Sequence, residues 1–167
     1  MKDALGDVNV IAEDLGFLTD GVRRLLHDSG FPGMKVIQFA FDSREESDYL
    51  PHNYEKNCVV YTGTHDNDTL CGWYKVLDPE DLKLSQKYMN NANTPKRQIH
   101  WDFIRLALAS VADLCIIPLQ DYLGLGSEAR INTPSTLGNN WRWRMTQGCL
   151  TKELADQIRE LTTLYGR

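Results

Sequence analysis

A dense group of chemically useful side chains lies at residues 62–69, with the sequence Thr-Gly-Thr-His-Asp-Asn-Asp-Thr. His65 and Asp66 could together move a proton or bind a polar ligand, although a lone His–Asp pair is more often structural. The alternative is an Asx-type turn formed by residues 66–68, with Asp68 capping a helix that starts near Thr69. We expect that structural role for Asp68, whereas the rest of the chain must decide the role of the other residues.

The element that positions this group is an apolar run at residues 58–61, which predicts a strand buried on both faces. Three more apolar runs predict strands at 8–12, 34–41 and 114–119. Acidic or polar residues follow each of these three runs: Glu13 and Asp14, Asp42, and Gln120 and Asp121. Functional groups are therefore expected at the carboxyl ends of several strands.

Cap residues, prolines and apolar periodicity predict four helices between and after these runs. They extend from Thr19 to Gly30, from Asp78 to about Met89, from Pro95 to Asp113, and from Thr151 towards the end of the chain. The third would be the longest. The polar segment 42–57 is expected to be a long surface loop.

The alternation of buried strands with helices predicts an α/β fold with a parallel sheet. Polar groups at the strand ends are typical of a (β/α)8 barrel, which needs about 250 residues and eight strands. Four predicted strands in 167 residues correspond to half of a TIM-type barrel, arranged as one domain over residues 1–167. The alternative, an open doubly wound sheet, is disfavoured because Glu13 and Asp14 occupy the place of a phosphate-binding loop.

Composition narrows the possible partners. A hydrophobic content of 42%, a charged content of 25% and a net charge of −5 suit a soluble globular domain and argue against a nucleic-acid partner. No apolar run approaches the length of a membrane span. The four cysteines have no zinc-site spacing, so we expect reduced thiols, and in the absence of a targeting pattern we expect a cytoplasmic protein.

Acids at several strand ends suit glycoside chemistry, in which one carboxyl group moves a proton and another stabilises a glycosyl-cation-like centre. Metal binding by the same carboxylates is the rival interpretation. It is weaker because a single nearby histidine is a poor ligand set.

Several motifs resemble the 4-α-glucanotransferases (amylomaltases or disproportionating enzymes) of glycoside hydrolase family 77. They are Ala-Glu-Asp-Leu-Gly at 12–16, Pro-Gly-Met-Lys-Val at 32–36, Leu-Pro-His-Asn at 50–53, the segment 61–69, and the segment from Gln-Asp at 120–121 to Gly-Asn-Asn-Trp at 138–141. The resemblance covers nearly the whole chain.

The resemblance implies an α-amylase-like barrel in which a retaining double displacement moves a 1,4-α-glucan segment to an acceptor glucan or glucose, without cofactor or metal. Glu13 would be the general acid/base and Asp66 the transition-state stabiliser. His65, Asn67 and His52 would contact the maltooligosaccharide substrate. The family's nucleophilic Asp belongs to an Arg-x-Asp-His motif that this sequence lacks, so the chain resembles the C-terminal half of the enzyme, needs the missing N-terminal half as a partner, and is expected to be inactive alone.

The alternative to an enzyme is a non-catalytic glucan-binding or assembly module built on the half-barrel. Such a module would form homo-oligomers through its exposed sheet edges. Hydrolysis in place of transfer is also open. Structural roles are expected for Asp14, for the turn or cap acids Asp42 and Asp121, and for Arg130, Arg142 and Arg144 in ion pairs. Trp73, Trp141 and Trp143 could stack on sugar rings but fit a packed core better.

Overall fold

The computed structural model describes residues 6, 8–16 and 18–167 and contains a three-stranded parallel sheet in the order β1-β2-β3. The strands are β1 (Gly33–Val36), β2 (Cys58–Tyr61) and β3 (Leu114–Ile116). Val36 lies opposite Tyr61, and Tyr61 lies opposite Ile116. The three strands therefore end side by side, at one edge of the sheet. The prediction of an α/β fold with a parallel sheet is confirmed.

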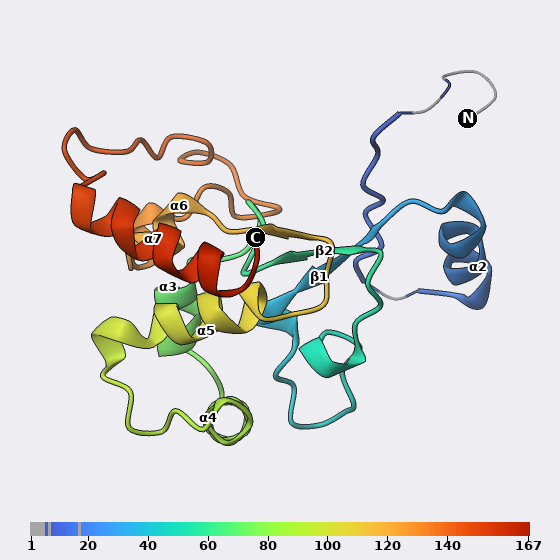
Figure 1. Ribbon diagram of the computed structural model, residues 1–167, viewed down its shortest axis with the longest axis horizontal. Helices are drawn as coiled ribbons and strands as arrows, with labels where there is room; N and C mark the ends of the chain where they lie inside the picture. The colour runs from blue at the N-terminus through green and yellow to red at the C-terminus, as the bar shows by residue number, and fades with distance from the viewer. Residues whose placement is uncertain (1–5, 7, 17) are drawn as a thin grey trace.

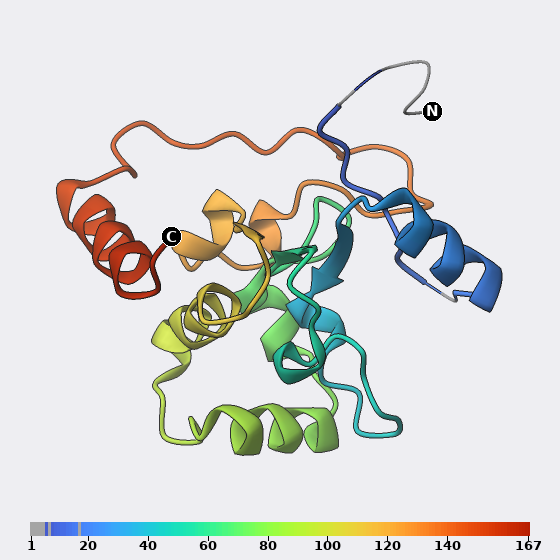
Figure 2. The same ribbon diagram turned by 45° about the vertical axis from the view of Figure 1, so that its right-hand side comes forward.

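Six helices are described around this sheet (Figure 1). They are α2 (Asp20–Ser29), α3 (Leu70–Lys75), α4 (Pro79–Met89), α5 (Ile99–Leu108), α6 (Leu119–Tyr122) and α7 (Lys152–Leu164). Both ribbon views place α3 and α5 beside the sheet, with α2 and α7 at opposite ends of the molecule (Figures 1 and 2).

The main core lies between the sheet and α5. Phe103 of α5 is fully buried, and its ring meets those of Trp73 at 5.3 Å, Tyr74 at 5.8 Å and Phe41 at 5.9 Å, all edge-on. Edge-to-face rings at these separations stabilise a core beyond the area that they bury. This packing fixes α3 against α5, and so holds the end of the loop that joins β2 to α3.

The helix caps that the sequence predicts are confirmed for α2, α4 and α7, where the capping residue lies next to its own helix. The Thr19 hydroxyl accepts a hydrogen bond from Val22 N, and Gly30 ends α2 with a left-handed φ of 67°. Asp78 caps α4 in the same way, with Pro79 at its first position, and Thr151 caps α7. A side chain that satisfies its own helix's first N–H groups needs no distant partner, which makes such caps readable from sequence.

The predicted strands differ from the observed ones. Residues 8–12 form no strand: among the backbone hydrogen bonds of the described residues, the one from Ala12 N to Pro32 O, at 2.9 Å, is the bond that joins them to the residues before β1. The run at 34–41 is strand only to Val36 and continues as the 3-10 helix Ile37–Phe39. The run at 114–119 ends as strand at Ile116, because Pro118 cannot donate to a ladder and precedes α6. Apolar character predicts burial, but it does not distinguish a strand from a buried helical turn.

The predicted length of one helix is also wrong. The helix expected from Pro95 to Asp113 is α5, which covers 10 residues after the 3-10 helix Lys96–Gln98, while α7, with 13 residues, is the longest described helix. The segment 42–57 is a loop, as expected, but it contains the 3-10 helix Pro51–Asn53, and it buries Ser47 and Tyr54. These anchors hold the loop against the core.

Candidate active site

A cavity of about 780 Å³ lies at the carboxyl ends of the strands. Its wall includes Tyr61 at the end of β2 and Ile116 at the end of β3, together with three residues of the motifs singled out above: Glu13, His65 and Asp66. Asn67 also lines it. Four of the five predicted site residues are therefore brought to one cavity.

The loop after β2 is shaped by hydrogen bonds within it. Asn67 Oδ1 accepts from both the backbone N–H and the hydroxyl of Thr64, each at 2.9 Å, and Asn67 N donates to Thr64 O at 3.2 Å, which closes a turn around Asp66. Thr69, rather than Asp68, caps α3 by accepting from Gly72 N. Asp68 is still structural, because its carboxylate accepts from the hydroxyl of Ser127 at 2.6 Å. The turn leaves Asp66 at the tip of the loop.

The Asp66 side chain is 47% exposed and is held on one side. Its Oδ1 accepts a hydrogen bond from Asn132 Nδ2 at 2.6 Å and lies 3.3 Å from His65 Nε2. Arg130 donates to the main-chain oxygen of Asp66 at 2.6 Å. A carboxylate that is anchored but open to solvent can still accept hydrogen bonds from a ligand.

Glu13 and Asp14 have different surroundings, as their alternation along the chain predicts. Glu13 is exposed and lines the cavity. Asp14 Oδ1 accepts from Met34 N at 2.6 Å, and a Cβ added to Gly33 would lie 2.7 Å from the Asp14 carboxylate. Asp14 thus joins the segment before α2 to the start of β1, and Gly33 leaves room for it. The structural role expected of Asp14 is confirmed.

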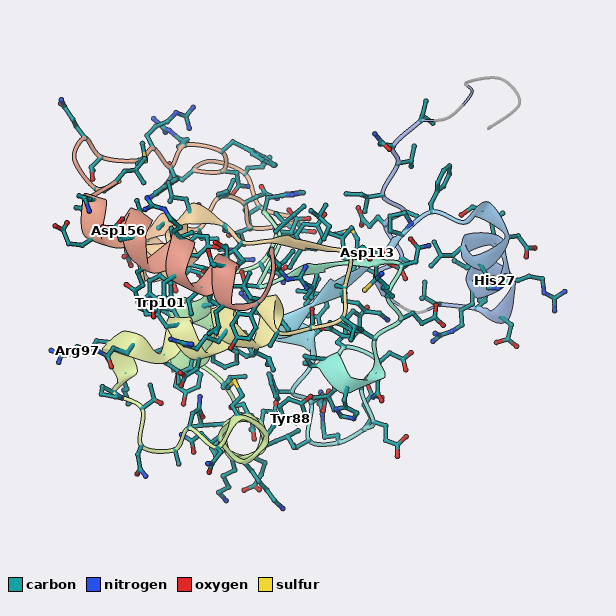
Figure 3. All side chains as sticks on the ribbon, viewed as in Figure 1. His27, Tyr88, Arg97, Trp101, Asp113 and Asp156 are labelled. Atoms are coloured by element: carbon teal, nitrogen blue, oxygen red, sulfur yellow. The ribbon has the colours of Figure 1, made fainter. Side chains whose placement is uncertain are left out.

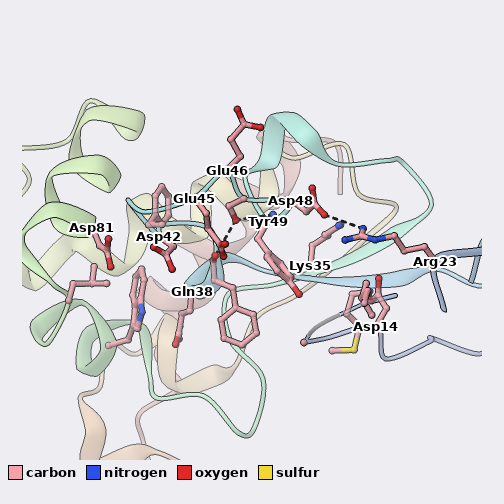
Figure 4. Close-up of a pocket in the computed structure, with 18 residues that line it drawn as sticks. Asp14, Arg23, Lys35, Gln38, Asp42, Glu45, Glu46, Asp48, Tyr49 and Asp81 are labelled. Atoms are coloured by element: carbon pink, nitrogen blue, oxygen red, sulfur yellow. Dashed lines mark hydrogen bonds and ion pairs between the residues drawn. The ribbon is translucent and has the colours of Figure 1, made fainter. Parts of the chain in front are cut away.

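A second cavity, of about 560 Å³, adjoins the first, since Gly16, Met34 and Phe39 line both. Figure 4 shows its acidic lining, which includes Asp14, Asp42, Glu45, Glu46, Asp48 and Asp81. Arg23 pairs with Asp48 at 3.2 Å, and the hydrogen bonds from Arg44 lower the pKa of Asp42 to about 2. Glu13 and Asp66 do not line this second cavity, so we assign the candidate active site to the first.

Comparison with known proteins identifies the family. The family model described as 4-alpha-glucanotransferase matches residues 1–151. The chain belongs to the 4-alpha-glucanotransferase family. The 4-alpha-glucanotransferase of Clostridium butyricum is 49% identical over 168 residues, and that of Thermus thermophilus is 43% identical over 172 residues. Each alignment covers 100% of this chain and 34% of the relative, so the chain spans about a third of their length.

The solved structures agree. An amylomaltase from Streptococcus agalactiae, in complex with acarbose, superposes with a TM-score of 0.92 at 39% identity, over 99% of this chain and 33% of that one. Amylomaltase from Corynebacterium glutamicum, at 15% identity and a TM-score of 0.69 over 92% of this chain and 28% of that one, shares the fold.

Of the five predicted site residues, His52 is the one that does not line the cavity. It lies in the 3-10 helix Pro51–Asn53, where its Nδ1 is 2.9 Å from the hydroxyl of Tyr88 on α4 and the two rings stack at 5.7 Å. Figure 3 labels Tyr88 beside α4. The geometry gives the predicted substrate contact of His52 no support.

The sequence did not single out Asn132 or the loop contacts of Arg130. The expected ion pairs are absent: among the described residues, Arg130 donates to the main-chain oxygens of Asp66 and Asn132, and Arg142 and Arg144 bond to amide or main-chain oxygens. The contact from Asn132 to Asp66 crosses 66 positions, and no periodicity marks it. Only the position of Asn132 inside the motif-rich segment 120–141 could have suggested a role.

Two other features bear on earlier expectations. Across residues 6, 8–16 and 18–167, no three His, Cys, Asp or Glu side chains converge to hold a metal ion. No helix in the same ranges is long and apolar enough to cross a membrane. A cytoplasmic location stays a prediction, because the related enzymes of Arabidopsis thaliana and Solanum tuberosum are named chloroplastic/amyloplastic.

Proposed function

We propose that this chain is the C-terminal half of a TIM-type barrel in a 4-α-glucanotransferase, about four βα units long. The enzyme would move a 1,4-α-glucan segment to an acceptor glucan or glucose by a retaining double displacement. The observation that carries the proposal is that Glu13, His65 and Asp66 line one cavity at the carboxyl ends of parallel strands. This is the face at which (β/α)8 barrels carry out their chemistry.

In this proposal Glu13 is the general acid/base. Its exposed side chain faces a cavity large enough for sugar units, so it could donate a proton to the departing glycosidic oxygen and then take one from the acceptor hydroxyl. Both steps use the same carboxyl group, as the double displacement requires.

Asp66 would stabilise the transition state by accepting hydrogen bonds from sugar hydroxyls, which strengthen as positive charge develops on the ring. His65 would donate to the same sugar from beside it. Asn67 commits its side-chain oxygen to Thr64, so its amide N–H groups are what it can offer to a substrate.

Beside Glu13 and Asp66, a retaining double displacement needs a carboxylate that forms the glycosyl-enzyme, and the Arg-x-Asp-His motif that carries this nucleophile in the family does not occur in this sequence. We propose that the upstream half of the barrel supplies it and covers the open edges of the sheet. β1 and β3 stand at these edges, and the β3 side chains Leu114 and Ile116 are 46% and 37% exposed. The isolated chain would then be inactive.

The test is disproportionation of maltotriose, measured with the 167-residue chain alone and with the chain in place of the matching third of the Clostridium butyricum enzyme. We expect activity only in the chimera, and a loss of roughly 10²- to 10⁴-fold on Glu13→Gln. Glu160→Gln, which changes an exposed acid on α7, is the matched control and should leave activity unchanged. Turnover by the chain alone, or a chimera indifferent to Glu13→Gln, would overturn the proposal.

A further inference from the structure

The segment after α6 returns to the loop that carries Asp66 and contacts it at the tip. Asn132 makes two of these contacts: its side-chain Nδ2 donates to Asp66 Oδ1 at 2.6 Å, and its backbone N–H donates to the main-chain oxygen of His65 at 3.1 Å. One residue thus fixes both the backbone of the loop and the side chain at its tip.

Neighbouring residues hold Asn132 itself in place. Arg130 donates through Nε to the main-chain oxygen of Asn132 at 2.8 Å and through its guanidinium to that of Asp66 at 2.6 Å. On the other side, Trp141 N donates to Ile131 O at 2.7 Å, and its ring lies 5.1 Å from that of His65. The two loops are therefore joined through main-chain atoms as well as through Asn132.

This arrangement divides the two oxygens of the Asp66 carboxylate. Oδ1 is occupied by Asn132, with His65 Nε2 also close to it, whereas Oδ2 accepts no hydrogen bond from any residue that the structure describes. The side chain is about half exposed, and an Asp χ2 torsion is otherwise broad. The bond from Asn132 therefore selects the rotation of the carboxylate and leaves Oδ2 for a ligand.

We infer that Asn132 is a positioning residue, which orients the Asp66 carboxylate so that its free oxygen accepts a hydrogen bond from a hydroxyl of the bound glucan. This inference rests on the proposed function of the cavity. Loss of one hydrogen bond to a charged group, such as that from Asn132 to Asp66, should lower the rate roughly 10- to 100-fold when the orientation of the carboxylate matters in the transition state.

The contact can be tested without turnover, by NMR of the side-chain amide groups of the 15N-labelled chain. One Asn132 amide proton should be shifted and protected from exchange, and Asp66→Ala should abolish both effects. The Asn91 amide, which donates to Asp102 Oδ2 at 2.8 Å, provides a matched pair away from the cavity: it should respond to Asp102→Ala and not to Asp66→Ala. An Asn132 amide that is indifferent to Asp66→Ala would overturn the inference.

The functional consequence is tested in the chimera described above. Asn132→Ala should lower kcat for maltotriose roughly 10- to 100-fold and change KM less than about threefold, because it disturbs orientation more than binding. Asn91→Ala breaks the same kind of bond elsewhere and should leave kcat per folded molecule unchanged. A chimera with normal turnover and no effect of Asn132→Ala would refute the positioning role alone. A chimera without turnover would refute the proposed function, and the NMR result would still decide the contact.

Discussion

The Asp121 carboxylate accepts a hydrogen bond from the Thr62 hydroxyl at 2.6 Å, in a site where Asp121 is only 2% exposed. Its other oxygen accepts from Leu70 N at 2.8 Å. Thr62 and Leu70 flank the loop that carries His65 and Asp66, so one buried acid on α6 holds both ends of that loop. The structural role predicted for Asp121 is confirmed: Thr69 is the residue that caps α3, and Asp121 accepts from the N–H of Leu70, the first residue of that helix, 51 positions away.

Asp121 should make stability depend on pH. Burial raises its pKa to about 6, against the opposing effect of the bonds from Leu70 and Thr62, and the nearby Asp68 carboxylate adds to the rise. Because the folded pKa exceeds the unfolded value, the protonated group contributes stability that is full below about pH 4 and is lost as pH rises through about 6. The contribution is of order 3 kcal/mol.

Asp121→Asn removes the titrating group and should flatten the dependence of the unfolding free energy on pH between 4 and 6. Urea denaturation at several pH values measures it, and the difference between the two proteins isolates Asp121 from the other acids. Asp113→Asn, at an exposed acid, is the control and should leave the slope unchanged. Equal slopes for wild type and Asp121→Asn would contradict the prediction.

Gly124 should be intolerant of alanine for two separate reasons. Its φ is +62°, which costs roughly 1 kcal/mol for an alanine, and an added Cβ would lie 2.8 Å from Cε1 of the His100 ring. That ring is buried on α5 and cannot move aside cheaply. Gly124→Ala should therefore lower the unfolding free energy by about 2–4 kcal/mol.

Gly148→Ala separates the two causes, because Gly148 has a φ of +82° but nothing within 4 Å of an added Cβ. We expect it to cost only the backbone part, about 1 kcal/mol. Denaturant midpoints of the two variants measure the difference. If Gly124→Ala lowered the unfolding free energy no more than Gly148→Ala does, the close approach of the added Cβ to the His100 ring would not be destabilising.

The parts of the fold that the sequence predicted are those set by local chemistry. Thr19, Asp78 and Thr151 cap their own helices. Cys58–Tyr61, whose apolar run predicted a strand, is the central strand of the described sheet and has a partner on each side. Residues 8–12 fail because a strand exists only with a partner, and the described chain offers this run one bond.

The candidate site likewise contains residues that the sequence could identify and residues whose role depends on distant packing. The residues at 65–67 follow β2, and the sequence grouped Glu13 with them on the expectation of a strand at 8–12; Glu13 lines the same cavity although that run forms no strand. Asn132 could not be identified in advance, because its role depends on a return loop that packs only after β3 and α6 have formed. His52 shows the converse: its motif suggested the site, but the packing of α4 placed Tyr88 beside it.

The exposed edge of β3 should make the isolated chain self-associate. Leu114 and Ile116 are 46% and 37% exposed on an edge strand, and such edges pair readily with other chains. Light scattering after size exclusion should give a mass above 19.1 kDa that increases with concentration.

Leu114→Lys should shift the chain towards monomer, because a charged side chain on an edge strand opposes pairing. Leu137→Lys is the matched control, since Leu137 is fully exposed and lies in a loop outside the strands, and it should leave the mass unchanged. A chain that is monomeric at all concentrations would show that this edge needs no cover, and would remove one argument for an upstream half of the barrel.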